Sequence, residues 1–476
     1  MGVKRNIIYS TVLTVSGYLF PLITFPYVTR VLGVNNFGIC NFYDGVVSYF
    51  ILFSMLGILN LGIREIARVK NDKRELTKVF GGLITLNLLT TALSIVALLI
   101  VGLTVPKLAE HPQMIYIGAA KVLVNTLLVE WFYKGMEDFR YITVRSILVR
   151  SVYVAAVFLF VRNSDDYILY FGLTTGMFVV NSLINIAHLR KFIHFSGINF
   201  NFKQFVKPYI ILGIYQILTS MYTTVNVVIL GFMAGDVQVG YYSTSVKLYY
   251  ILLSFYSAFS GVLLPRMSTL LAQNDKANFH YLISKSSSVL FIITIPLIII
   301  IFSFSPTIIN LIAGPGFGPA SDCLRIIIPM MLIHGFDMIV TYQILFPMNQ
   351  DRPIFINSVI GAVVGLSLNF ILVPHLQSIG SSIVLLCSET AVFASALYFV
   401  SKISKFDFKL NLLLKIVLFS VPAILIIVVS GITGHQTITA FAVSSALIGA
   451  YFVAVDIFSL KILGLNKLLA RIKKSS

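Results

Sequence analysis

Long apolar runs, each bounded by charged residues, Gly or Pro, follow one another along almost the whole chain. A run of about 20 apolar residues is long enough to cross a bilayer as an α-helix. Counting such runs predicts an all-α, polytopic membrane protein with fourteen transmembrane helices. The predicted helices are 7–29, 39–63, 79–103, 113–133, 142–161, 167–188, 208–231, 239–264, 286–312, 326–347, 353–373, 378–400, 411–430 and 436–459.

The composition excludes large soluble domains. The 476 residues are 58% hydrophobic and 11% charged, whereas soluble domains carry about 25% charged residues. Every predicted external connection is short, and the chain has no Walker loop, no dinucleotide-binding fingerprint and no His or Cys cluster with metal-ligand spacing. We therefore expect a protein that is not an enzyme and that uses no cofactor and no metal.

The net charge of +17 is explained by the position of the basic residues. If the N-terminus is cytoplasmic, 28 of the 35 Lys and Arg residues fall in cytoplasmic connections, as the positive-inside rule requires. This pattern predicts that both termini are cytoplasmic, and it accounts for the charge without a nucleic-acid partner. The count assigns Arg145 and Lys415, near the starts of their predicted helices, to the cytoplasmic connections, and it leaves Lys121, Arg150 and Lys247 within the spans.

The chain also contains an internal repeat. A shift of about 202 residues places the first two helices on the seventh and eighth, with Phe37-Gly38 on Val239-Gly240, and a shift near 212 aligns helices four to six with ten to twelve. We therefore predict a six-helix bundle over 1–190, a cytoplasmic linker over 191–207, a second six-helix bundle over 208–402, and two extra helices with a basic tail over 403–476.

Cations inside the spans are the first candidate binding groups, because ionisable residues in a membrane are costly and usually face a cavity. Lys247 shares one helical face with Tyr250 and Ser254, which favours a substrate-binding stripe over a polar packing seam. Lys121 is as consistent with a cavity as with packing. Arg150 binds substrate or snorkels to the inner interface, and Arg30 binds substrate or anchors the outer interface.

Acidic groups inside the spans are candidates for energy coupling, or are halves of neutral ion pairs. His334 and Asp337 are three residues apart on one helix and could exchange protons, unless His334 is a satisfied core residue. Glu389 and Asn369 on neighbouring helices could instead hold a small cation. The coupling candidates are Glu389, Asp44, Asp337, His334 and Asn369.

Several local strings resemble one family, the Wzx-type polysaccharide (O-antigen) flippases of the superfamily that includes lipid II flippases and multidrug (MATE-type) exporters. Each string alone is weak, but they occur in order and at the family's spacing. They are 27–33 (YVTRVLG), 37–38 (FG), 62–67 (GIREIA), 130–137 (EWFYKGME), 166–168 (DYI), 239–242 (VGYY) with Lys247, 264–266 (LPR) and 343–345 (QIL), followed by Asn369, Pro374, Gly380 and Glu389.

The resemblance implies a multi-pass protein of the bacterial inner membrane that moves a polyprenyl-pyrophosphate-linked oligosaccharide to the external leaflet by alternating access. Lys247 matches a cationic position shared with lipid II flippases, whereas Asp44 replaces a more usual neutral polar residue. Membrane lipid and a coupling H⁺ or Na⁺ are the other expected partners. The alternatives are a cation-coupled multidrug exporter and, from another class, a membrane polysaccharide polymerase or glycosyltransferase.

Overall fold

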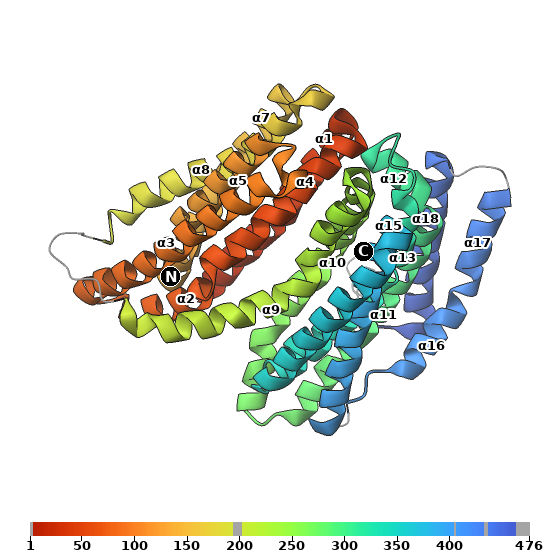
Figure 1. Ribbon diagram of the computed structural model, residues 1–476. Helices are drawn as coiled ribbons and strands as arrows, with labels where there is room; N and C mark the ends of the chain where they lie inside the picture. Colours follow the sequence, from red (N-terminus) through yellow and green to blue (C-terminus); the bar gives the residue numbers. More distant parts are fainter. Residues whose placement is uncertain (1–2, 194–201, 404–405, 433–436, 463–476) are drawn as a thin grey trace, which may run out of the picture. The chain divides into compact units, whose positions relative to one another are not determined.

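The computed structural model describes residues 3–193, 202–403, 406–432 and 437–462, and among these residues it contains helices and no strand (Figure 1). The helices are α1 Val3–Met55, α2 Ile58–Val69, α3 Lys73–Thr104, α4 Pro106–Ala109, α5 Pro112–Leu127, α6 Glu130–Gly135, α7 Phe139–Phe160, η1 Ser164–Asp166, α8 Tyr167–Leu189, α9 Lys203–Ala234, α10 Asp236–Ala272, α11 Lys276–Ser303, α12 Ser305–Ala313, α13 Ala320–Ile327, α14 Met330–Met338, η2 Ile339–Leu345, α15 Asp351–Ile403, α16 Leu410–Phe419, α17 Val421–Ile432, α18 Ile438–Val455 and η3 Asp456–Leu460.

Two helices are too long for one crossing. Helices α1 and α15 each have 53 residues, about 80 Å at 1.5 Å per residue, against a hydrocarbon thickness of about 30 Å. Each is broken near its middle, α1 at Gly33 (φ 71°) and α15 at Gln377 (φ 51°). Each therefore has the length and the break for two of the predicted spans.

The number of spans stays a prediction. Among the described residues, nine helical stretches are long and apolar enough to cross a membrane, or ten if the bent pair Ala320–Ile327 and Met330–Leu345 is one span. Each predicted segment falls mainly on helix where the structure describes it, with short non-helical breaks at positions such as 56–57, 128–129 and 328–329. The helical positions therefore agree with the apolar runs, and the count of fourteen is not established.

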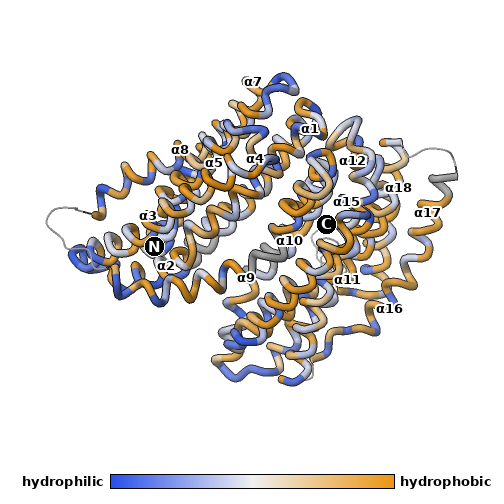
Figure 2. The backbone as a smooth tube through the Cα atoms, in the orientation of Figure 1, coloured by the Kyte–Doolittle hydropathy of each residue, from blue (hydrophilic) through white to orange (hydrophobic). Residues whose placement is uncertain are grey.

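The surface of the helices suits a lipid environment. Figure 2 shows hydrophobic residues along most of the helices and hydrophilic residues gathered at several helix ends. Large apolar side chains such as Leu93, Val152 and Leu418 are among the most exposed, which in a soluble protein would cost free energy. The chain is a multi-pass membrane protein.

Short polar side chains begin several helices. Asp72 accepts hydrogen bonds from the backbone N–H groups of Arg74 (2.9 Å) and Glu75 (3.1 Å), and so caps α3. Asp275 caps α11 in the same way, and its bonds from the side chain and backbone of Asn278 lower the pKa of its carboxyl.

Pro106 and Pro112 occupy first-turn positions of α4 and α5, where a missing N–H costs nothing.

The chain forms two compact units, Met1–Ser243 and Thr244–Ser476. In the first unit, α1 contacts α3, α5, α7 and α9, and Trp131 stacks on Phe80 with ring centroids 5.5 Å apart. In the second, α15 packs against α13 and α14, and Phe291 stacks on Phe336 at 5.7 Å. The predicted bundle boundary at 191–207 stays a prediction, and residues 194–201 of that linker lie outside the described ones.

Alternate connections of the first unit meet at the same end, as expected for helices that cross a membrane in turn. At one end Asn36 Nδ2 donates to Ser164 O (2.8 Å) and Tyr43 Oη donates to Lys107 O (3.1 Å). Connections at the other end are joined by the ion pair of Lys70 and Glu137 (3.0 Å). Which end faces the cytoplasm stays a prediction.

The internal repeat has a structural counterpart. Gly33, where α1 breaks, has φ 71° and ψ 174°, and Gly235, between α9 and α10, has φ 87° and ψ 174°. The two glycines are 202 residues apart, which is the shift of the repeat. Only glycine adopts such angles without strain, so both halves turn the chain in the same way before their second helix.

Candidate functional site

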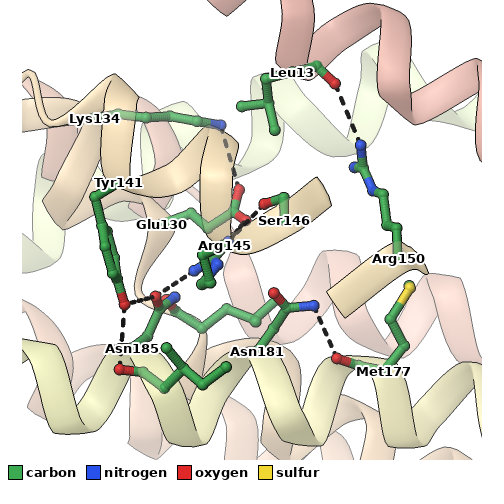
Figure 3. Close-up of polar contacts among 12 residues, drawn as sticks. Leu13, Glu130, Lys134, Tyr141, Arg145, Ser146, Arg150, Met177, Asn181 and Asn185 are labelled. Atoms are coloured by element: carbon green, nitrogen blue, oxygen red, sulfur yellow. Dashed lines mark hydrogen bonds and ion pairs between the residues drawn. The ribbon is translucent and has the colours of Figure 1, made fainter. Parts of the chain in front are cut away.

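A buried arginine on α7 is the centre of the polar network in the first unit (Figure 3). Asp138 caps α7, and Arg145 lies two turns further along the helix. Arg145 Nη2 donates to Glu130 Oε1 (2.9 Å) of α6, and Nη1 donates to Asn185 Oδ1 of α8. The Arg145 side chain is 3% exposed, so its charge depends on these protein partners rather than on water.

Asn185 joins this network to a helix break. Between α5 and α6, Val129 has a left-handed backbone (φ 41°), so the helical bonding is interrupted there. Asn185 Nδ2 donates to the carbonyl of Leu128 at the break, and Tyr133 Oη donates to the Asn185 carbonyl (2.5 Å). Tyr141 Oη also donates to Asn185 Oδ1 (2.9 Å). Asn185 therefore supplies a hydrogen-bond donor to the free carbonyl at the helix break and an acceptor that positions Arg145.

Positive charge exceeds negative charge in this network. Glu130 also lies 3.7 Å from Lys134 Nζ. Half-buried Arg150, five residues after Arg145, donates to Leu13 O (3.3 Å) and Ser16 Oγ (2.5 Å) of α1. Lys134, Arg145, Arg150 and Glu130 thus carry a formal charge of +2. Such an excess next to a membrane is suited to an anionic group.

Lys121, predicted to bind substrate, is paired with Asp44, predicted as a coupling residue. The Lys121 ammonium of α5 contacts Asp44 Oδ1 of α1. The same ammonium lies 5.7 Å from the Phe171 ring and 5.4 Å from the Phe178 ring of α8. The buried lysine therefore has a carboxylate and two aromatic faces as partners. This geometry agrees with the alternative in which Asp44 is one half of a neutral ion pair.

Arg30 and Arg150 are not brought together. Arg30 is exposed, one turn before the break at Gly33. Arg150 contacts α1 at Leu13 and Ser16, about 20 Å or more from Arg30 along the helix. One binding site that uses both guanidinium groups on a single phosphate is excluded by this separation.

The predicted stripe on α10 is seen in part. Lys247, Tyr250 and Ser254 are all half-buried. Ser254 Oγ donates to Ile251 O (2.6 Å) within its own helix. The side chains of Ser220, Thr223 and Ser257, which the sequence places on comparable polar faces, lie outside the described ones. A binding role for this stripe stays a prediction.

In the second unit, His334 contacts Glu389 and not its predicted neighbour Asp337. His334 Nδ1 of α14 lies 3.3 Å from Glu389 Oε2 of α15, at ion-pair distance and without the alignment of a hydrogen bond. Asp337 instead accepts from Thr341 Oγ1 at 3.4 Å. The residue spacing predicted a pair of His334 and Asp337 within one helix, whereas the packing of α14 on α15 brings the carboxylate of Glu389 next to His334.

The predicted small-cation site involves Glu389 of α15 and Asn369, which lies on the same long helix. Buried Asn369 donates through Nδ2 to Gly365 O (2.8 Å) in its own helix. Within the described ranges, no group of three or more His, Cys, Asp or Glu side chains could hold a metal ion. A cation held by Glu389 and Asn369 stays a prediction.

The two central residues of the network in Figure 3, Arg145 and Asn185, are not among the site residues predicted from the sequence. The charge count places Arg145 with the cytoplasmic connection after the fourth predicted helix, whereas the structure buries Arg145 inside α7, which begins at Phe139; the side of the membrane stays a prediction. Asn185 lies in an apolar run and was not considered. A cation two turns inside an amphipathic helix, and an Asn in an apolar run, are the signals that could have revealed them.

Comparison with known proteins gives consistent matches. The sequence pattern of a family described as "Polysaccharide biosynthesis protein" matches residues 3–271. A protein provisionally named an O-antigen transporter in Escherichia coli (strain K12) is 26% identical over 406 residues, covering 84% of this chain and 97% of that protein. A protein of the same name from Shigella dysenteriae is 22% identical over 396 residues, covering 82% and 98%.

Solved structures share the fold. The lipid II flippase MurJ in its inward closed conformation matches with a TM-score of 0.73 and 15% identity, over 96% of this chain and 99% of MurJ. An inward-facing multidrug resistance MATE family transporter of the MOP superfamily matches with a TM-score of 0.59 and 13% identity, over 83% and 98%. The predicted all-α, MATE- and MOP-like fold class is confirmed.

Proposed function

We propose that this chain, which belongs to the polysaccharide biosynthesis protein family, is a flippase for a lipid-linked oligosaccharide. In the finer form of the proposal, the substrate is a polyprenyl-pyrophosphate-linked oligosaccharide. It moves from the cytoplasmic to the external leaflet of the bacterial inner membrane. The relatives named O-antigen transporters support this assignment, because each is covered almost completely by the match.

The observation that carries the proposal within the structure is the excess of cations in the first unit. A sugar diphosphate cannot cross hydrocarbon alone, because its charges would lose their hydration. Arg145 and Arg150 place guanidinium groups in helices that lie in the membrane. Guanidinium groups bind phosphate strongly, so this unit offers the charge that a diphosphate needs, while the prenyl chain stays in lipid.

Transport is proposed to run by alternating access, with the energy taken from an ion gradient or from the gradient of the substrate itself. Glu389 is the first candidate for coupling, because it is buried and its partner His334 is a histidine, the side chain whose ordinary pKa lies nearest to neutral pH. H⁺ is therefore favoured over Na⁺ at this pair. A bound ion can bias the two states only by its different affinity for each of them.

The second candidate function is a cation-coupled multidrug exporter, which the likeness to MATE structures supports. The two candidates differ in the charge of the ligand that they require. A drug exporter needs acidic groups toward a cationic or amphipathic ligand, whereas the first unit carries an excess of arginine and lysine beside Glu130. The arrangement therefore favours an anionic ligand.

The test is translocation of a lipid-linked oligosaccharide in proteoliposomes. Vesicles with the purified chain should expose labelled substrate to an external glycosidase faster than vesicles without protein. Lys247→Ala should abolish this activity while the protein still inserts, and Lys247→Arg should retain part of it. Normal flipping by Lys247→Ala would remove Lys247 from the binding site. Export of cationic drugs with no flipping would favour the second candidate.

A further inference from the structure

A groove between α7 and α8 lies beside the polar network of the first unit and shares Arg145 with it. It has a volume of about 520 Å³, within the size range of small-molecule sites. Its apolar wall comprises Val144 and Leu148 of α7 and Ile184 of α8, all three of which are exposed. Its polar lining comprises Asp138, Arg140, Tyr141 and buried Arg145.

The groove has a charged end and an apolar body. Arg140, Val144 and Leu148 are spaced four residues apart, so they form one row along a single face of α7. The row begins with an exposed guanidinium in the first turn of the helix and continues with aliphatic side chains for two turns. That sequence of groups matches a lipid whose anionic head lies at the interface and whose chain lies in the hydrocarbon.

Arg145 adds a second, independent feature. Its two Nη atoms bind Glu130 and Asn185, but its Nε is buried and makes no hydrogen bond. An unsatisfied N–H in a side chain this buried costs free energy, so Arg145 keeps an unused hydrogen-bond donor beside the groove.

The acidic residue at the rim is already engaged. The carboxylate of Asp138 accepts from the backbone of Tyr141 (3.4 Å) and lies 3.7 Å from His188 Nε2. Glu130, the carboxylate behind Arg145, is shared with Lys134. Two cations, Arg140 and Arg145, and one anion, Asp138, line the groove, so its charged lining carries a formal charge of +1.

We propose that this groove is a binding site for the lipid carrier, with one polyprenyl chain along Val144, Leu148 and Ile184 and its phosphate on Arg140. The proposal rests on the proposed function, which supplies the class of lipid. The exposed apolar side chains of the groove form one row, Val144 and Leu148 of α7 beside Ile184 of α8, which fits one hydrocarbon chain better than the two of a glycerophospholipid. The site would collect the carrier lipid at the protein surface before its head group is translocated.

The test is lipid binding measured by native mass spectrometry on the purified full chain. The probe is undecaprenyl phosphate, with phosphatidylglycerol and phosphatidylcholine as competitors. Arg140→Ala should weaken binding of the probe about five- to tenfold through the lost charge-assisted contact. Arg140→Lys should keep most of it, and Leu148→Trp should reduce it to a similar extent as Arg140→Ala by filling the groove.

Matched controls separate the groove from the general surface. Leu183 of α8 is 61% exposed and does not line the groove, whereas Leu148 is 62% exposed, so Leu183→Trp makes the same change outside it. Arg162→Ala removes an exposed arginine after the other end of α7. Both controls should bind undecaprenyl phosphate within twofold of wild type.

Three results would overturn the proposal. The first is equal loss of probe binding in Leu183→Trp and Leu148→Trp. The second is unchanged probe binding in both Arg140→Ala and Leu148→Trp. The third is displacement of the probe by equimolar phosphatidylglycerol. Flipping assays keep this proposal apart from the proposed function. If wild type binds the probe in the groove but does not flip the substrate, only the proposed function is refuted. If wild type flips the substrate and Arg140→Ala and Leu148→Trp both bind the probe and flip normally, only the groove is refuted.

Discussion

Lys107 Nζ lies 3.3 Å from Asp236 Oδ1, and the same ammonium lies 5.1 Å from the centre of the Phe42 ring. Lys107 belongs to the connection after α3, and Asp236 is the first residue of α10. Both side chains are mostly buried, so the pair is less screened than a surface ion pair. It links α4 to the start of α10 at the end of the first unit where α1 breaks.

Breaking this pair should loosen that end of the unit. Lys107→Glu removes an interaction of about 1 kcal/mol and adds repulsion, so exposure of the nearby buried Cys40 should rise. Maleimide labelling of Cys40, in a Cys323→Ser and Cys387→Ser background, should be about three- to tenfold faster. The charge swap of Lys107→Asp with Asp236→Lys should return the rate toward wild type, and no recovery would mean that the two groups do not act as a pair.

Gly38 should tolerate no side chain. A Cβ at Gly38 would lie 1.8 Å from the carbonyl oxygen of Asp236, which is rigid backbone. We expect Gly38→Ala to destabilise the protein by about 2–3 kcal/mol and to lower its Tm in detergent by several degrees. Gly172→Ala on α8 is the matched control, since a Cβ there meets no atom within 4 Å, and it should be neutral or slightly stabilising. Equal Tm values would contradict the close contact.

The ion pair of Arg145 and Glu130 should respond unequally to loss of either partner. Arg145 is 3% exposed and Glu130 is 32% exposed with Lys134 as a second partner. Glu130→Ala leaves a buried charge and should cost about 3 kcal/mol, whereas Arg145→Met should cost about 1 kcal/mol. Unfolding in sodium dodecyl sulfate measures both free energies. A larger cost for Arg145→Met than for Glu130→Ala would show that Glu130 depends on the ion pair more than Arg145 does.

Energy coupling should depend on Glu389 if the His334 contact responds to protons. Flipping by wild type is expected to accelerate when a proton gradient is imposed, and Glu389→Gln should lose that response, because the amide cannot take up a proton or pair with protonated His334. The measurement is the flipping rate with and without the gradient, with a sodium gradient in parallel. An equal response in both proteins would make Glu389 structural.

Membrane topology tests the distribution of charge. Reporter fusions after Lys207 and after Ser476 should be cytoplasmic, and a fusion after Asp236 should be external, because basic connections resist translocation. Asp236 contacts Lys107, also in a predicted external connection, so the two should give the same result. An external C-terminus would show that the number of spans is odd.

Hydropathy predicted the positions of the helices well, since burial in lipid depends on each segment alone. It could not predict the partner of a charged residue. Lys121 and Asp44 are 77 residues apart and meet only through the packing of α5 on α1. His334 likewise contacts Glu389, far along the chain, rather than Asp337, which its spacing suggested. Arg145 was misplaced because charge alone does not distinguish a connection from the buried face of a helix.

The contacts of the two repeated turns are reciprocal. A Cβ at Gly38 would meet Asp236, and a Cβ at Gly240 would lie 2.4 Å from the carbonyl oxygen of Val34. Asp236 and Gly240 are the repeat equivalents of Val34 and Gly38, 202 residues on. Reciprocal contact between equivalent residues is the mark of an isologous, two-fold interface. Both turns lie within the first unit, so a side chain added at either glycine would displace the backbone of the other turn.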